Sequence, residues 1–466
     1  MTGVQTCALP IYRVFKTNIC LNIIQFEDLS FPTNELRDIL QKLNIKPSEN
    51  LIYDLNQMSQ VSNLGSLIIP HSNKNELVNA ANNIRENNIG FNIFERNRTD
   101  ALLNAINQLI KLVEKFQCVV TNPPYLGSRK MNLLLSEWLK NNIYSDTSRD
   151  LYASFIKRCI SFSRTKGYVS MITQVSWMFT NDFKRFRDSF IDNYQLVNGV
   201  ILGSGAFETI SGEVVKSCVF TIVNDLYDEP TTFIDLSKSI DKVSKLHESP
   251  KYLRQLNIFK DLDHKAFAFK LNDKSIKLVS KSPLLSEYVD VKQGLATGYN
   301  DRFVRYFWEI ESDNFIHDET NYKIGIKWYP YDKGGGFRKY YGNYLNVVNW
   351  DSNGIEIKNF TDSKGKLRSR PQNEVFYFKE GLTFNLTGTI SFRYKGQGHI
   401  FDVQGSSLFI KDKSDFSLSM LCGILNSKLA EFFTELTNPT MVTQVGDINS
   451  IPLVTPSQVN KELIER

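Results

Sequence analysis

Hydrophobic and polar positions follow helical spacing in the first part of the chain. Apolar residues recur every three or four positions at 34–43 and 102–116, within a mostly helical segment from residue 18 to about 114. A short run with β-branched residues at 116–120 follows directly and ends at a proline-rich turn. This run predicts a buried strand.

Strands and helices alternate after this turn. The expected elements are a helix at 150–163, a strand at 167–174, a helix at 183–194, and strands at 196–203 and 214–224. Such alternation is typical of an α/β domain with a parallel sheet.

The pattern changes after about residue 225. Lysine-rich, weakly periodic sequence runs to about 283, and short strands, glycine turns and many aromatic residues follow. One clear helix is expected at 416–436. We therefore predict a second, α+β domain at 255–466.

Composition narrows the class of protein. The 466 residues favour two or three domains, and the net charge of +5 is compatible with a polyanionic partner without identifying one. The six cysteines form no CxxC pair and the five histidines have no ligand spacing, which predicts a cytoplasmic protein without disulfides or a metal site. No apolar run is long enough to span a membrane.

The first twelve residues, MTGVQTCALPIY, do not fit the rest of the chain. They lack the charged start and apolar core of a signal peptide. They resemble translated sequencing-adaptor sequence at the end of a gene fragment. We therefore expect residues 1–12 to be non-native, the genuine protein to begin near Arg13, and its real N-terminal part to be missing.

The stretch VVTNPPYLG at 119–127 carries the clearest chemistry. Turns after strands of open α/β sheets lie where ligands bind. Two prolines fix the backbone and remove two N–H donors, which leaves the Asn122 side-chain oxygen and the Pro123 carbonyl as rigid acceptors. These acceptors suit the two N–H bonds of an amino group such as that of adenine, with its ring stacked on Tyr125. The alternative is a proline-stiffened turn without chemistry.

Longer blocks resemble the PglX family of adenine-specific methyltransferases from BREX phage-defence systems. The first two blocks are VVTNPPYLGSRKMN and DLYASFIKRCISFSRTKGYVSMITQVSWMF. The first of them contains the NPPY loop, which is a signature of amino-group DNA methyltransferases. The later ones include GAFETISGEVVKSCVF, VKQGLATGYNDRFVR, WYPYDKGGGFRKYYG, FDVQGSSLF and NPTMVTQVGDINSIP. They run in order from about residue 119 to 452, so the resemblance covers most of the chain.

The resemblance implies a reaction and a site. A methyl group is transferred from S-adenosylmethionine to the N6 of an adenine flipped out of double-stranded DNA. Asn122, Pro123, Pro124 and Tyr125 form the catalytic loop, and Asp150 and Tyr152 lie on the next helix. Phe207 matches the aromatic that stacks on the base opposite Tyr125, although it can equally be a core residue in a loop. Other BREX proteins are the implied partners.

The resemblance also implies the fold, but one motif that is typical of the family is missing from this chain. We expect a Rossmann-like methyltransferase domain at 13–250, incomplete at its N-terminal side, followed by a target-recognition domain at 255–466. The family's glycine-rich donor loop is missing before Asn122, and we interpret the later LGSGAF, with Gly203 and Gly205, as a coincidence. Glu27 or Asp28 matches a position near the donor's adenine, with an exposed acidic turn as the alternative. We therefore expect a truncated chain that is inactive, or nearly so, by itself.

Basic residues in the second domain are the candidates for DNA binding. Arg302, Lys333, Arg338 and Lys339 lie among glycines and aromatics, and their charges suit phosphates and guanine edges. We expect Arg393, Tyr394 and Lys395 to extend this surface. The alternative is a set of solvated basic loops.

Two other functions stay open from the sequence. The chain can be the methyltransferase and specificity portion of a combined restriction–modification enzyme, or a non-catalytic DNA-binding specificity subunit. The intact NPPY loop argues against the second, because a pure DNA-binding protein has no use for an amino-group clamp.

Overall fold

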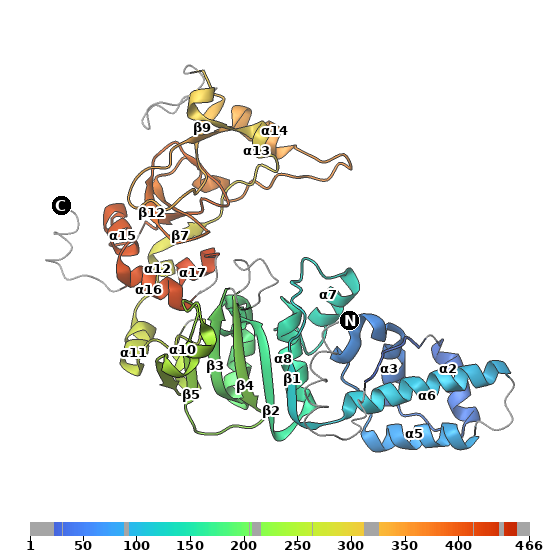
Figure 1. The fold of residues 1–466 in the computed structure, drawn as a ribbon. Coiled ribbons are helices and arrows are strands. Elements are labelled where there is room, and N and C mark those ends of the chain that lie inside the picture. Colours follow the sequence, from blue (N-terminus) through green and yellow to red (C-terminus); the bar gives the residue numbers. More distant parts are fainter. Residues whose placement is uncertain are drawn as a thin grey trace.

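The computed structural model describes residues 23–29, 31–87, 93–204, 206, 216–262, 264–311, 326–412, 414–437 and 442–453. Figure 1 shows three parts in chain order: a helical module (31–113, blue), a central sheet (green), and a C-terminal lobe (285–453, yellow to red). The module contains α2 (Thr33–Lys42), α3 (Glu49–Gln57), α4 (Val61–Leu64), α5 (Lys74–Asn87) and α6 (Ile93–Val113), with 3₁₀ turns η1 (Met58–Gln60) and η2 (Gly65–Leu67).

Local sequence explains these helices. Ser48 caps α3 by accepting a hydrogen bond from the Leu51 N–H. The apolar positions Leu36 and Leu40 of α2 are buried in the module's core, which also receives Leu135 and Leu139 of α7 (Leu133–Lys140). The helix expected at 102–116 is longer than predicted, because α6 begins at Ile93.

The central sheet is mixed, so the prediction of a parallel sheet was wrong. Its strands are β1 (Phe116–Thr121), β2 (Ser163–Gln174), β3 (Gln195–Gly203), β4 (Ser217–Val223), β5 (Thr231–Asp235) and β6 (Lys251–Arg254), in the order β1-β2-β4-β3-β5-β6. The pairs β1–β2 and β3–β5 are parallel, whereas β4 is antiparallel to both of its neighbours. No helix of the described residues joins β3 to β4, and β4 returns beside β3 as antiparallel connections allow.

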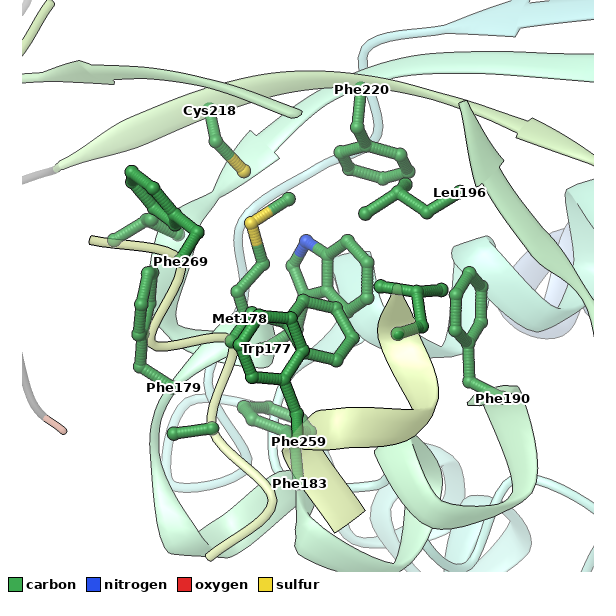
Figure 2. Close-up of a cluster of buried hydrophobic side chains, with 14 of the residues drawn as sticks. Trp177, Met178, Phe179, Phe183, Phe190, Leu196, Cys218, Phe220, Phe259 and Phe269 are labelled. Carbon is green, nitrogen blue, oxygen red and sulfur yellow. The ribbon is translucent and has the colours of Figure 1, made fainter. Parts of the chain in front are cut away.

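One face of the sheet carries an aromatic core. It is covered by α8 (Leu151–Phe162), α9 (Lys184–Asn193) and residues between β6 and α11 (Asp273–Lys281), with η3 (Val175–Met178), η4 (Asn181–Phe183) and η5 (Leu256–Asp261) between them. Trp177 lies within this cluster in Figure 2, with its ring centroid 4.8 Å from that of Phe220 and 5.6 Å from that of Phe190. This core holds the ends of β2 and β4 in place.

The opposite face and the β1 edge are more open. Along β2, Val169 and Met171 are buried, whereas Tyr168 between β1 and β4 is 47% exposed. Val120 of β1 is 73% exposed and Cys118 is also exposed. The prediction that 116–120 forms a buried strand was therefore wrong in its burial, because β1 pairs with β2 alone among the described residues.

The C-terminal lobe contains short strands and short helices. One sheet has the order β13-β9-β10-β8 and the other β12-β11-β14-β7. The strands are β7 (Val289–Lys292), β8 (Val304–Tyr306), β9 (Trp328–Asp332), β10 (Asn346–Asn349), β11 (Gly381–Phe384), β12 (Phe392–Lys395), β13 (Ile400–Phe401) and β14 (Ser407–Ile410). The helices are α12 (Leu285–Tyr288), α13 (Asn300–Phe303), α14 (Asp351–Lys358), α15 (Leu418–Leu425), α16 (Lys428–Thr437) and α17 (Val445–Asn449), with turns η6 (Phe307–Glu309) and η8 (Glu374–Phe376). Outside the lobe, α10 (Lys242–Glu248) precedes β6.

The helix expected at 416–436 is two helices, α15 and α16. The break falls at Asn426, whose side chain accepts a hydrogen bond from the Phe392 N–H and donates one to the Phe392 carbonyl. A contact with β12 therefore ends the helix. Within the described ranges, no helix is long and apolar enough to cross a membrane.

Candidate active site

The proline-rich loop leaves the sheet at the carboxyl end of β1. Asn122 and Pro124 are exposed, Pro123 is buried and Tyr125 is half-buried. Because β1 and β2 are parallel, the loop lies beside the end of β2 and the η3 turn that follows it. The structure therefore places the predicted residues at the sheet edge where ligands of α/β proteins bind.

The start of α8 anchors the loop from behind. Asp150 Oδ1 accepts a hydrogen bond from the Leu126 N–H at 3.1 Å, and the Leu151 N–H donates to the Leu126 carbonyl at 3.0 Å. The Ser128 N–H donates to the Arg149 carbonyl at 2.9 Å. Burial raises the pKa of Asp150, while the backbone N–H donors act in the opposite direction. Asp150 thus positions the proline-rich loop through the backbone just after Tyr125.

Tyr125 reaches into the aromatic core behind the loop. Its ring meets that of Tyr152 edge to face, and the Tyr152 hydroxyl is 2.7 Å from the Ser176 hydroxyl. The hydroxyls of Tyr125 and Ser217 are buried and lie close enough to interact, since Ser217 opposes the rise in the pKa of Tyr125, and neither makes another hydrogen bond among the described residues. Burial raises the pKa of Tyr125 to about 12, so its side chain stays a neutral phenol.

Sequence reasoning did not identify Ser176 and Ser217. Both lie at the carboxyl edge, Ser176 just after β2 and Ser217 at the first position of β4. The only signal was a polar residue beside an apolar strand, which is common in proteins. Their relation to Tyr125 depends on tertiary packing.

The acidic candidates for donor binding are already engaged in the helical module. Asp28 accepts hydrogen bonds from the Ser62 N–H at 2.8 Å and the Ser62 hydroxyl at 2.5 Å, and these bonds lower its pKa. Glu27 accepts a hydrogen bond from the Asn104 side chain at 2.8 Å. Asn63 follows Ser62 in the chain, and its side-chain oxygen accepts a hydrogen bond from Asn132, the N-cap residue of α7. Asp28 therefore lies close to the segment after the proline-rich loop, and its role toward a donor stays a prediction.

The predicted stacking residue Phe207 lies outside the described residues, as does Gly205 of LGSGAF. Gly203 ends β3 with a φ of +70°, and a Cβ there would come within 2.8 Å of the Ser237 Cα. Packing against Ser237 accounts for this glycine. It borders a cavity of about 340 Å³, which is also lined by the Asp235–Lys270 ion pair and by Phe432 of α16.

The four basic candidates in the C-terminal lobe differ in their surroundings. Arg338 is exposed and Lys333 is half-buried. Arg302 forms an ion pair with Glu356, and Lys339 donates a hydrogen bond to the Asn426 carbonyl at 2.7 Å. Arg338 therefore offers the most accessible charge of the four.

The prediction that residues 393–395 extend the DNA-binding surface was wrong for Arg393 and Lys395. Arg393 donates hydrogen bonds to backbone carbonyls, and Lys395 donates to the Lys379 carbonyl. Both side chains are buried. They support the lobe from inside because buried cations need such acceptors. Among the residues that the structure covers, no group of three or more His, Cys, Asp or Glu side chains is arranged to hold a metal ion.

Comparison with known proteins agrees with the sequence resemblance. Residues 12–207 match the model of the Eco57I restriction-modification methylase family. The adenine-specific methyltransferase PglX of Lacticaseibacillus casei (strain Zhang) is 30% identical over 464 residues, which cover 95% of this chain and 38% of that protein. The adenine-specific methyltransferase BrxX of Escherichia coli O9:H4 (strain HS) is 29% identical over 413 residues, covering 87% of this chain and 33% of that protein. The predicted resemblance to the PglX family is confirmed, and the chain spans well under half the length of these relatives.

A solved structure shares the fold. The Type IIL restriction-modification enzyme MmeI, in complex with DNA, aligns with a TM-score of 0.52 and 11% identity. The alignment covers 75% of this chain and 48% of that one. This chain therefore shares its fold with part of a restriction–modification enzyme, and the division into two domains stays a prediction.

Proposed function

We propose that this chain is the base-binding and DNA-reading part of a BREX adenine-N6 DNA methyltransferase. The observation that carries the proposal is the Asn122–Tyr125 loop, held at the carboxyl end of β1 by Asp150. The names of both curated relatives support it, since each is an adenine-specific methyltransferase.

The loop suits a planar amino group. The Asn122 side-chain oxygen and the Pro123 carbonyl accept its two N–H bonds, which draws the nitrogen toward tetrahedral geometry and localises its lone pair. Because these acceptors are fixed before the substrate arrives, electrostatic preorganisation promotes the attack and no strong base is required. The proline rings keep the acceptors in place.

Aromatic stacking holds the base. Tyr125 stacks on one face of the flipped adenine, and its position is set by the contact with Tyr152. Phe207 closes the opposite face. Extrusion of the base from the duplex costs unpairing and unstacking, which these contacts partly offset.

S-adenosylmethionine supplies the methyl group in this proposal. Among the described residues β1 is the first strand, so no strand followed by a glycine-rich turn precedes Asn122. The residues present therefore do not fit the methionine end of the donor, and we assign no donor contact except the predicted one at Asp28. The open edge of β1 leaves room for further strands beside it.

Double-stranded DNA is the proposed partner of the C-terminal lobe. Arg338 and Lys333 provide charge at its surface, and Arg302 and Lys339 contribute after exchanging their present contacts for phosphates. Other BREX proteins are the proposed protein partners.

Substitution of Asn122 by alanine tests the proposal. In a full-length methyltransferase that contains this chain, we expect Asn122→Ala to abolish N6-adenine methylation while DNA affinity is retained, because the amide acts on the base rather than on the backbone. Asn141→Ala, at an exposed position after α7, is the matched control. Unchanged methylation in Asn122→Ala would instead favour a specificity subunit without catalysis.

Calorimetric titration of S-adenosylmethionine into this chain tests the donor assignment. We expect no binding up to millimolar donor. Micromolar binding would move the donor site to another turn, with Gly203 the first to be mutated.

A combined restriction–modification enzyme is the second candidate. The match to a restriction-modification methylase family favours it. Magnesium-dependent cleavage of unmethylated DNA by the product of the gene that encodes this chain would support this candidate over the BREX assignment.

A further inference from the structure

A short loop between β9 and β10 exposes three aromatic side chains together. Phe337, Tyr340 and Tyr341 are 59%, 57% and 64% exposed, and Arg338 beside them is also exposed. We call residues 333–344 the aromatic loop. Its sequence, KGGGFRKYYGNY, contains three cations and no acidic residue. Clustered exposed aromatics mark an interaction surface, and the charge favours a polyanion.

The backbone of the aromatic loop is fixed from inside the lobe. Arg393 of β12 is only 1% exposed and donates hydrogen bonds to the carbonyls of Gly334 at 2.9 Å and Arg338 at 3.4 Å. The Asn343 side chain donates to the carbonyls of Gly334 and Gly336. The Tyr340 N–H donates to the Phe392 carbonyl at 2.8 Å, and the Tyr394 N–H donates to the Tyr340 carbonyl at 2.9 Å. Burial of the Arg393 charge costs free energy unless hydrogen bonds compensate for the lost water, so these contacts hold the loop carbonyls beside the guanidinium.

The exposed rings are braced by their neighbours. Tyr341 meets Tyr344 edge to face at 4.9 Å, and Tyr344 meets His399 in the same way at 5.1 Å. His399 in turn contacts the buried Asp332 at 3.1 Å. Rings supported in this way lose little conformational freedom when they bind a partner.

Contacts within the lobe also fix the positions of the Lys339 and Arg338 side chains. The Lys339 ammonium lies 5.8 Å from the centre of the Phe337 ring and donates to the Asn426 carbonyl. Arg338 lies over Gly342, where a Cβ would come within 2.7 Å of the Arg338 Cδ. Gly342 has a φ of +112°, a region that glycine adopts readily.

We propose that the aromatic loop contacts the bases of distorted duplex DNA, with Phe337 and Tyr341 stacking against them and Arg338 binding the backbone. The proposal rests on the proposed function, because a methyltransferase that flips a base must deform the duplex. Aromatic and apolar wedges at unstacked steps stabilise such deformation. In this account Arg393 is a positioning residue that holds the loop without touching DNA.

The test uses random-sequence 30-base-pair duplexes, some carrying 2-aminopurine, and this chain without a methyl donor. Fluorescence anisotropy gives affinity, and 2-aminopurine emission reports unstacking. For the Phe337→Ala/Tyr341→Ala double variant we expect affinity to fall about tenfold or more with an unchanged salt dependence, and the emission increase to disappear. Tyr227→Ala removes an exposed aromatic outside the lobe and is the matched control.

Three further variants separate charge from positioning. Arg338→Ala should lower the slope of log affinity against log salt by about one. Arg393→Gln should reduce the 2-aminopurine signal although all the exposed aromatics remain, while Arg393→Lys should rescue part of it. Circular dichroism melting of each variant identifies those that fail to fold.

The outcomes distinguish the two proposals. A double variant that binds DNA and increases 2-aminopurine emission as the wild type does overturns the role of the aromatic loop and leaves the proposed function standing. A folded wild-type chain that does not bind duplex DNA overturns both.

Discussion

Tyr125 and Tyr152 meet edge to face, with ring centroids 5.9 Å apart and ring planes inclined by 76°. The contact joins the proline-rich loop to α8, the helix whose N-cap residue Asp150 also binds the loop. One helix thus fixes both the backbone and the aromatic ring of the loop. The loop geometry is therefore a property of the fold in the absence of substrate.

The buried hydroxyl of Tyr125 gives the first prediction. Because the Ser217 hydroxyl is the only polar side chain close enough to hydrogen-bond with this hydroxyl among the described residues, Tyr125→Phe should change the free energy of unfolding by no more than about 1 kcal/mol, and should retain methyl transfer in a full-length methyltransferase that contains this chain. Tyr125→Ala removes the stacking ring and should lose methyl transfer, with a cost in stability of about 2 kcal/mol. Urea unfolding and a methylation assay check both. A Phe variant as inactive as the Ala variant would show that the hydroxyl takes part in the reaction.

Asp150 gives a prediction with a pH dependence. Its raised pKa means that the folded state binds a proton more tightly than the unfolded state, so ionisation of Asp150 costs stability above that pKa. Asp150→Asn keeps an acceptor for the Leu126 N–H and should be as stable as the wild type, or more stable, at pH 7. Asp150→Ala loses the acceptor and should be less stable by about 1 kcal/mol and slower in methylation. Equal behaviour of the Asn and Ala variants would contradict the positioning role.

Arg187 is predicted to be essential for the core. This buried residue of α9 donates hydrogen bonds to four carbonyls, those of Trp177, Phe179, His264 and Lys265. Arg187→Met leaves these acceptors without their donor and should lower the free energy of unfolding by about 3 kcal/mol or more. Arg185→Ala, at an exposed position of the same helix, should change it by less than about 0.5 kcal/mol. Thermal and urea unfolding of the two variants compare them directly.

Lys395 should make stability rise with pH. Burial lowers its pKa from 10.5 to about 8, so between these values the unfolded chain binds a proton that the folded chain has released. The wild type should therefore gain stability relative to Lys395→Met as the pH rises from about 8 to 10.5. Urea unfolding across this range measures the difference between the two proteins. Lys428→Met, at an exposed side chain, should show no such trend, and a flat difference for Lys395→Met would disprove the shift.

Local patterns predicted much of the fold. The apolar spacing of α2, α8 and α9 and the apolar runs of β2, β3 and β4 identified these elements close to their observed bounds. The position of the proline-rich loop could be predicted because two prolines directly after a strand mark a rigid turn. Such features depend only on residues near one another in the chain.

Features that depend on distant residues could not be predicted. β1 is apolar like a buried strand, yet its burial is decided by which strands lie beside it. Asn426 ends α15 through hydrogen bonds to Phe392. Arg393 lies in a sequence that is typical of a basic surface loop, yet its side chain is buried because it donates hydrogen bonds to the carbonyls of Gly334 and Arg338. In each case the deciding partner lies far away in the sequence.

The most direct test of the central claim is the N6-methyladenine content of DNA from a strain that expresses a full-length methyltransferase containing this chain. Mass spectrometry of digested DNA should be compared for the wild type, Asn122→Ala and Asn141→Ala at equal protein levels. The account predicts N6-methyladenine in the wild type and in Asn141→Ala, and its loss in Asn122→Ala. Undiminished methylation in Asn122→Ala would contradict it.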